Sequence, residues 1–204
     1  FSVLNAKGTD LTVIDIIKNY IFSVLTKDVP LDDAREAWSK IKSNTEKEDI
    51  KIFYRHFWLS KYKFVTEKNL VKEFVHAVHN SEDNYRNFLN DLESASEDYK
   101  QIINPVEKDW STQESKPVYS CLYALNLFKV TQVRTLLLSL FYVKNKKLIS
   151  HKSYLNTVRN LEYFHFVFTA ICSSRASGLE SKYSSFARKI RSSTDQNITN
   201  NILQ

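Results

Sequence analysis

Two histidines, His76 and His79, lie three positions apart in the segment HAVH. On a helix this spacing places both imidazoles on one face, where they could bind a metal ion. Zinc proteases that use a helical histidine pair have the pattern HExxH, in which the glutamate serves as the base. This sequence has neither that spacing nor that glutamate, and no further ligand cluster accompanies the pair. We therefore expect surface or interface histidines and no metal site.

Cys121 and Cys172 are the candidate nucleophiles. Each lies in an apolar run, and an apolar setting raises the pKa of a thiol and makes it inert. We expect two buried, reduced cysteines, which are typical of a cytoplasmic protein. The sequence also lacks GxSxG, a Walker loop and Cys-x-x-Cys. We therefore expect no catalytic residue in this chain and no cofactor bound to it.

Aromatic and cationic residues alternate in the segment KIFYRHFWLSKYKF, residues 51–64. Aromatic rings beside cations can stack on bases and hold phosphates. The same pattern is produced by an amphipathic helix that has an aromatic core stripe and a cationic outer face. We favour the core interpretation. The residues concerned are Phe53, Tyr54, Phe57, Trp58, Tyr62 and Phe64 with Lys51, Arg55, Lys61 and Lys63.

The positive charge of the chain is concentrated in its second half. The formal net charge is +6, from 29 basic and 23 acidic residues, but residues 1–100 carry −2 and residues 101–204 carry +8. A basic surface of this kind fits a polyanion, of which nucleic acid is the commonest. Two clusters carry it: Lys144, Lys146, Lys147 and Lys152, and then Arg188, Lys189 and Arg191.

The first basic cluster has no acidic residue near it between Val130 and Asn160. Its charges are therefore not neutralised by local pairing, and with the second cluster it could form a clamp on DNA phosphates. Solubility is the competing explanation, because lysines are common in loops and no base-reading residue is identifiable. Both interpretations stay open.

Helices must position these residues, because the chain has only two glycines and three prolines in 204 residues. So few turn-forming residues exclude an all-β fold and any glycine-rich nucleotide-binding loop. We expect an all-α fold, an irregular bundle of eight to ten helices. Capping residues and apolar periodicity predict helices over residues 13–25, 31–43, 47–61, 67–80, 82–103, 117–129, 130–147, 150–173 and 181–193, with a short one after Thr194.

The segment 150–173 is the most apolar of the chain. Phe164, Phe166 and Phe168 alternate as in a strand, but helical spacing holds over a longer stretch and predicts a buried central helix. Its rings should join a core that contains Phe57, Trp58, Leu137, Phe164 and Phe168. The polar stretch 104–117 contains two of the three prolines and marks a sub-boundary within the helical domain.

Three stretches resemble one protein family. Residues 4–22, LNAKGTDLTVIDIIKNYIF, look like the LN-x-KG-x-x-LT-x-x-D-x-x-KN-Y-I-F signature that follows the DGQQR motif in GmrSD-type proteins. These are bacterial proteins of the phage-defence and modification-dependent restriction group. FYRHFWLSKYKFVTEKNL and LEYFHFVFTAICSSRASGLESKYSSFARKI resemble two later stretches of the family. The resemblance covers nearly the whole chain in the right order.

Family members have a ParB-like nucleotide-binding domain with DGQQR before this region and often an HNH nuclease domain after it, and neither motif is present here. The resemblance therefore implies the helical middle region of a larger protein. Residues 1–25 would be the tail of the upstream domain, and residues 26–204 the helical domain. The residues implied to face the upstream domain are Asn5, Lys7, Gly8, Asp15, Lys18 and Asn19.

The function expected from the resemblance is a non-catalytic module that couples an NTP-binding domain to a DNA-cleaving domain and contacts DNA. The parent would be a cytoplasmic NTP-dependent DNA endonuclease, and the partners would be its upstream and downstream domains and DNA. No apolar run reaches membrane-spanning length, so we expect no membrane contact. The alternative is a helical protein–protein interaction scaffold with no nucleic-acid role.

Overall fold

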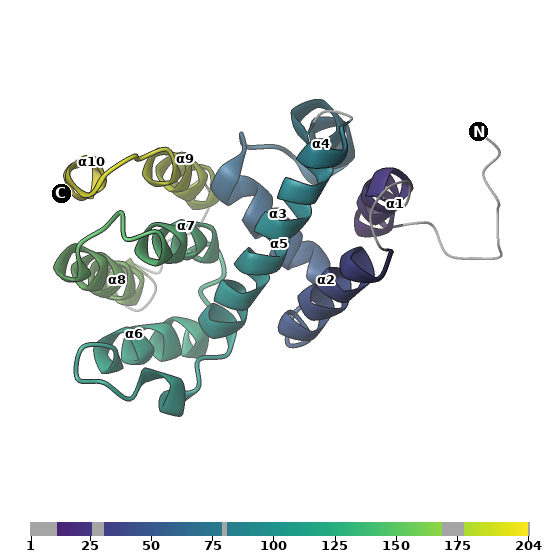
Figure 1. Cartoon of the computed structure of the whole chain (residues 1–204). Helices are drawn as coiled ribbons and strands as arrows, with labels where there is room; N and C mark the ends of the chain where they lie inside the picture. Colours follow the sequence, from purple (N-terminus) through teal and green to yellow (C-terminus); the bar gives the residue numbers. More distant parts are fainter. Residues whose placement is uncertain (1–11, 26–30, 79–80, 169–177, 204) are drawn as a thin grey trace.

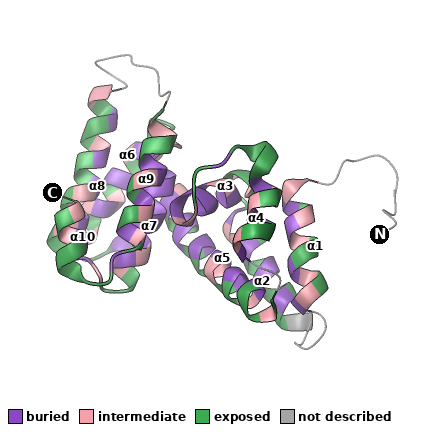
Figure 2. Ribbon diagram, turned by 90° about the horizontal axis from the view of Figure 1, so that it is seen from above, coloured by how far each residue is buried: buried purple, intermediate pink, exposed green. Residues whose placement is uncertain are grey.

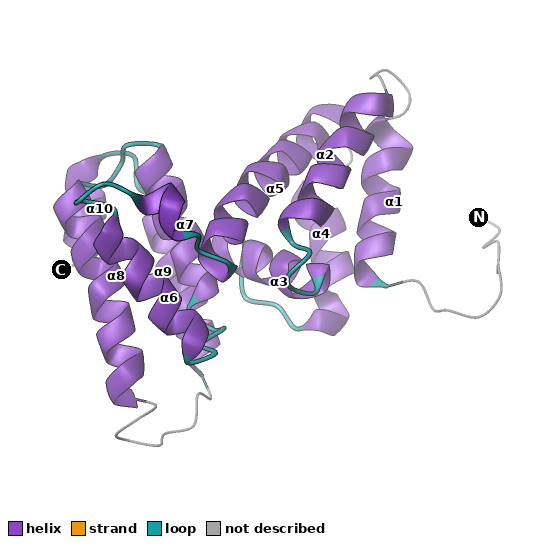
Figure 3. Cartoon of the chain, turned by 90° about the horizontal axis from the view of Figure 1, so that it is seen from below, coloured by secondary structure: helices purple, strands orange, loops and turns teal. Residues whose placement is uncertain are grey.

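The computed structural model describes residues 12–25, 31–78, 81–168 and 178–203. Every regular element in these ranges is a helix, and none is a strand (Figure 3). The predicted all-α fold of eight to ten helices is confirmed. The α-helices are α1 (Val13–Leu25), α2 (Leu31–Asn44), α3 (Ile50–Lys61), α4 (Leu70–Val78), α5 (Glu82–Ile103), α6 (Lys116–Leu127), α7 (Arg134–Asn145), α8 (His151–Phe166), α9 (Leu179–Arg191) and α10 (Gln196–Ile202). Two short 3₁₀-helices, η1 (Glu67–Asn69) and η2 (Glu107–Trp110), lie in the connections.

Local capping residues set the starts of several helices, as the sequence predicts. Before α1, the hydroxyl of Thr12 accepts a hydrogen bond from the Asp15 amide at 3.2 Å, and the Thr12 amide donates to the Asp15 carboxylate at 3.1 Å. This is a reciprocal capping box. Ser81 caps α5, and Ser150 caps α8. At α9 the cap is Gly178, with φ at +84°, a conformation that favours glycine.

Helix α5 runs diagonally through the molecule, and the other helices lie on its two sides (Figure 1). Helices α1, α2 and α4 lie on one side, and α6 to α10 on the other. Helix α3 packs against α5, α7 and α9 and so connects the two groups. Buried residues gather where helices face one another (Figure 2). The polar stretch 104–117 connects α5 to α6 and is anchored by Trp110, which is buried edge-on against Phe141.

The aromatic residues of α3 form a core stripe, as we favoured. Phe53, Tyr54, Phe57 and Trp58 are all buried. The Phe57 ring meets Phe88 of α5 edge-on, with ring centroids 5.6 Å apart. Such edge-on pairs add about 0.5–1.5 kcal/mol to the gain from burial. Lys51 and Lys63 are exposed, whereas Arg55 and Lys61 are half-buried. The core interpretation therefore holds for the rings within α3 but is wrong for Phe64, which lies after the helix and is 41% exposed.

The central helix is α7, and the prediction that residues 150–173 form it is wrong. Leu137 of α7 is buried as predicted, and α7 packs against α3, α5, α8 and α9. Helix α8 packs against α6 and α7, and His165 near its end contacts Tyr183 of α9, but Phe164 is 41% exposed and Phe168 is half-buried. Helix α8 therefore has more apolar side chains than its buried face holds, and the others are exposed or half-buried.

Lysines occupy left-handed positions directly after α6 and α7. Lys129 has φ at +55° and Lys147 at +58°. In each case the next residue donates an amide hydrogen bond back over the helix end, from Val130 to Leu125 and from Leu148 to Val143. This is the Schellman arrangement, in which glycine is preferred. The lysines therefore hold a strained backbone at both helix ends.

Candidate functional site

The structure brings the two predicted basic clusters to the same end of the molecule. Helices α7 and α9 lie side by side and run in the same direction. Near their starts, Leu136 of α7 and Tyr183 of α9 line the same cavity. Near their ends, the Arg191 guanidinium lies 4.3 Å from the Tyr142 ring centre. Beyond α9, Gln196 donates a hydrogen bond to the Lys147 carbonyl at 3.0 Å. The last turns of both helices therefore lie together.

We call this surface the basic end and define it by five of the predicted residues. Two lie in the connection after α7, one in the first turn of α8 and two in the last turn of α9. Arg188 is half-buried and the other four are exposed. The connection is fixed in place by the Ser150 amide, which donates to the Asn200 side chain of α10. The residues of the basic end are Lys146, Lys147, Lys152, Arg188 and Lys189.

Lys144 belongs to the predicted cluster in sequence but packs into the protein. Its ammonium group lies 5.0 Å from the ring centre of Tyr154 and 5.4 Å from that of Trp110. Burial lowers the pKa of Lys144, and the nearby carboxylate of Asp98 opposes that shift. These cation–π contacts stabilise the charged ammonium group beside the rings. Lys144 is therefore not a surface contact for DNA in this conformation.

Arg191 also packs inward, over the Tyr142 ring, and its Nη1 donates to the Ser60 hydroxyl at 2.7 Å. Burial lowers the pKa of its guanidinium, and the charge of Asp91 opposes the shift. The guanidinium lines a surface cavity of about 190 Å³ beside the basic end. The cavity is lined by Lys61, Asp91, Tyr142, Arg188, Arg191 and Ser192. The sequence did not place Lys61 or Asp91 with the basic clusters.

A buried carboxylate lies behind this surface. Asp98 of α5 is 8% exposed and accepts a hydrogen bond from the side-chain amide of Asn145 at 2.9 Å. Burial raises the pKa of Asp98 to about 6, although the charges of Arg191 and Lys144 lower it. Asp98 therefore offers part of the counter-charge for the two cations that pack inward.

The residues implied to face an upstream domain lie on or before α1. Asp15 is the capping carboxylate described above, and Asn19 is exposed. The Lys18 ammonium lies 5.4 Å from the ring centre of Phe22 and 5.9 Å from that of Trp38. Helix α1 itself packs against α3, α4 and α5. Asn5, Lys7 and Gly8 lie outside the described residues.

Of the other sequence candidates, the structure describes His76 and Cys121. His76 is exposed on α4, and His79 lies outside the described residues. Cys121 is buried as predicted, and burial raises the pKa of its thiol to about 11. Cys172 lies outside the described residues. Among the residues described, no three histidine, cysteine or acidic side chains gather in a way that could hold a metal ion.

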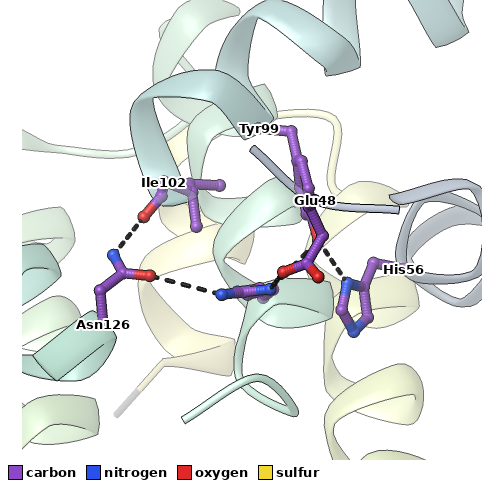
Figure 4. A network of polar contacts seen from close by, with 6 residues as sticks. Glu48, His56, Tyr99, Ile102 and Asn126 are labelled. Atoms are coloured by element: carbon purple, nitrogen blue, oxygen red, sulfur yellow. Dashed lines mark hydrogen bonds and ion pairs between the residues drawn. The ribbon is translucent and has the colours of Figure 1, made fainter. Parts of the chain in front are cut away.

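A buried polar network, missed by the sequence analysis, joins α3, α5, α6 and α7 (Figure 4). Arg134, which is 8% exposed, forms an ion pair with Glu48 and donates to the side-chain oxygen of Asn126 at 3.4 Å. Asn126 in turn donates to the Ile102 carbonyl at 2.6 Å. These contacts join residues of α3, α5, α6 and α7, so the network holds the four helices together.

The chain was compared with known proteins. No protein-family model, curated protein or solved structure matches it. Within the described ranges, no helix has the length and apolar character needed to cross a membrane.

Proposed function

We propose that this chain is a non-catalytic helical module that contacts the DNA backbone through the basic end. In a GmrSD-like parent protein it would couple the NTP-binding domain to the DNA-cleaving domain, as the sequence resemblance implies. The observation that carries the DNA-binding part is the convergence of the basic last turns of α7 and α9, shown by the contact of Arg191 with Tyr142. Two clusters separated by some forty residues in the sequence thereby form one cationic surface.

The arrangement suits contact with phosphates and not with bases. Four of the five residues of the basic end are exposed lysines, which bind phosphates as flexible point charges. The amide side chains of α10 beside the basic end, Gln196 and Asn200, are already hydrogen-bonded to the Lys147 carbonyl and the Ser150 amide. We therefore expect binding that is independent of DNA sequence and strongly dependent on salt.

The test is the triple variant Lys146→Glu, Lys147→Glu and Lys152→Glu. Binding to a labelled duplex is measured by fluorescence anisotropy at several salt concentrations. The slope of log affinity against log salt should become shallower by about one for each phosphate contact that is lost. The loss should be the same for duplexes of unrelated sequence. Lys144 is left unchanged because it packs inward.

The matched control is Lys47→Glu, Lys68→Glu and Lys72→Glu, three exposed lysines in the α1–α5 part of the chain. This variant has the same change of charge and should keep most of the wild-type affinity. If both variants lose affinity equally, net charge explains the binding and the basic end has no special role. Equal affinity of the basic-end variant and the wild type would remove this surface from the mechanism.

A protein–protein scaffold is the second candidate, and one observation favours it. Aromatic residues at the ends of α6 and α8 form an exposed patch, in which the rings of Phe128 and Phe166 lie 6.1 Å apart. Tyr163, one turn before Phe166, is 67% exposed. Contiguous apolar patches of this kind are typical of interaction surfaces. Loss of self-association or of domain binding in the variant Phe128→Ser/Tyr163→Ser, with DNA binding intact, would support this role.

A further inference from the structure

We propose that the cavity lined by Lys61, Arg188 and Arg191 binds a phosphate monoester, such as the terminal phosphate of a DNA strand. This rests on the proposed function in so far as the phosphate belongs to DNA. The exposed lysines of the basic end do not line this cavity. It combines a fixed guanidinium, two further cations and one carboxylate in about 190 Å³.

The lining of the cavity is cationic. It contains three cations and the carboxylate of Asp91, which forms an ion pair with Lys61. Asp98 behind the cavity offsets a further part of the charge of Arg191. A phosphate monoester carries about −1.5 to −2 at neutral pH and can pair with several of these cations at once.

Arg191 is held in place by ring contacts and a hydrogen bond. Its guanidinium is packed between Tyr142 and the last turn of α3, with ring centres of Tyr142 and Phe57 at 4.3 and 5.9 Å. One hydrogen bond, to Ser60, holds it in place. A guanidinium has five N–H donors, and among the described residues Ser60 is the only hydrogen-bond acceptor of this one. An arginine that is already fixed in place and has unused N–H donors is suited to bind an oxyanion, because binding costs little side-chain entropy.

The cavity is small. Pockets for drug-sized ligands occupy about 300–1,000 Å³, and this one occupies about 190 Å³, enough for a compact charged group but not for a base pair. Tyr142 and Ser192 complete the lining, and the Ser192 hydroxyl donates to the Lys189 carbonyl at 2.9 Å. The chemistry of the lining is therefore that of an anion site of phosphate size at the edge of the basic end.

The experiment is isothermal titration calorimetry of the full chain with inorganic phosphate, with a nucleoside 5′-monophosphate and with its nucleoside. A second series uses one duplex prepared with 5′-phosphate and with 5′-hydroxyl ends. We expect binding of inorganic phosphate and the monophosphate, no binding of the nucleoside, and at least about tenfold preference for the phosphorylated duplex end. Preference for the duplex end over the free monophosphate identifies DNA as the source, and the reverse identifies a free nucleotide.

The variants separate a binding role from a structural one. Lys61→Gln and Arg188→Gln should each weaken phosphate binding about tenfold. Asp91→Asn should tighten it, because the competing carboxylate is removed and Lys61 is released for the ligand; damage to the fold would not tighten binding. Lys182→Gln is the control, since Lys182 is exposed on α9 and belongs neither to the cavity lining nor to the basic end. It should leave phosphate binding unchanged.

The outcomes distinguish this inference from the proposed function. DNA binding without any preference for a phosphorylated end, together with no heat from inorganic phosphate, would overturn the cavity assignment and leave the basic end intact. Phosphate binding that depends on Lys61 and Arg188, without duplex binding, would support the cavity and contradict the DNA module. Weaker binding in Asp91→Asn would also overturn the assignment.

Discussion

The Nδ1 atom of His56 lies 2.9 Å from the phenol oxygen of Tyr99, and both side chains are buried. Arg134 also donates to this phenol oxygen, at 3.5 Å. The direction of the hydrogen bond between His56 and Tyr99 depends on which ring nitrogen carries the proton. Burial, together with the charges of Arg134 and Arg55, lowers the pKa of His56 to about 3, so the imidazole is neutral at pH 7.

This relationship predicts a loss of stability in acid. The unfolded chain takes up a proton on His56 below a pKa of about 6.5, and the folded chain does so only near pH 3. The free energy of unfolding should therefore fall by about 1.4 kcal/mol per pH unit over this window from His56 alone. Urea titrations between pH 7 and pH 4 measure it. His56→Gln should flatten the difference, and the exposed His151→Gln should not.

The raised pKa of Asp98 predicts the opposite dependence of stability on pH. Its folded pKa is about 6 and its unfolded pKa about 3.9, so its charge weakens the fold as the pH rises from about 4 to 6. Asp98→Asn keeps an acceptor for Asn145 and should stabilise the protein by up to about 2–3 kcal/mol at pH 7. The gain should vanish near pH 3.5. Glu97→Gln, the exposed neighbour, should change stability by less than about 0.5 kcal/mol.

The ion pair of Arg134 and Glu48 should be costly to break from either side. Arg134→Ala and Glu48→Ala should each destabilise the protein by about 3–5 kcal/mol, because each leaves a buried or half-buried charge without its partner. The double variant should cost less than the sum. Lys40→Ala at the exposed pair of Lys40 and Glu36 is the control, with an effect of about 0.5 kcal/mol or less. Additive losses in the thermal unfolding midpoints would contradict the coupling.

The two left-handed lysines allow stability and DNA binding to be separated. Lys129→Gly and Lys147→Gly should each stabilise the fold by about 1 kcal/mol, because glycine takes this conformation without strain. Only Lys147 belongs to the basic end. Lys147→Gly should therefore also weaken DNA binding and lower the salt slope by about 0.9, whereas Lys129→Gly should not. Equal DNA affinity of the two variants would exclude a phosphate contact at Lys147.

Local signals in the sequence predicted the fold well. The capping box at Thr12 and the cap at Ser81 act within four residues, so they are visible without knowledge of packing. Helical periodicity likewise placed the aromatic rings of α3 in the core. Apolar content misled at α8, because it does not tell how many neighbouring helices cover a helix. Phe164 is apolar but 41% exposed.

The candidate site was only partly predictable for the same physical reason. Arg188 and Arg191 stood out as a local charge cluster, but Lys61 joins them from more than a hundred residues earlier, through the packing of α3 against α9. Lys144 has the sequence context of a surface lysine and becomes half-buried only because Trp110 and Tyr154 lie beside it. Contacts between residues that are distant in the sequence leave no pattern in the local sequence from which they could be predicted.

The packing of α9 against α3 also sets the order of events during synthesis. Ser184 donates to the Leu59 carbonyl and Arg191 to Ser60, across 125 and 131 residues of chain. At ribosomal rates of about 5–20 residues per second, the side of α3 that carries Leu59 and Ser60 emerges roughly ten seconds before α9 can cover it. Contacts between residues so distant in the sequence form late, because a long loop must close first. The nascent chain is thus a candidate substrate for chaperones until α9 has been translated.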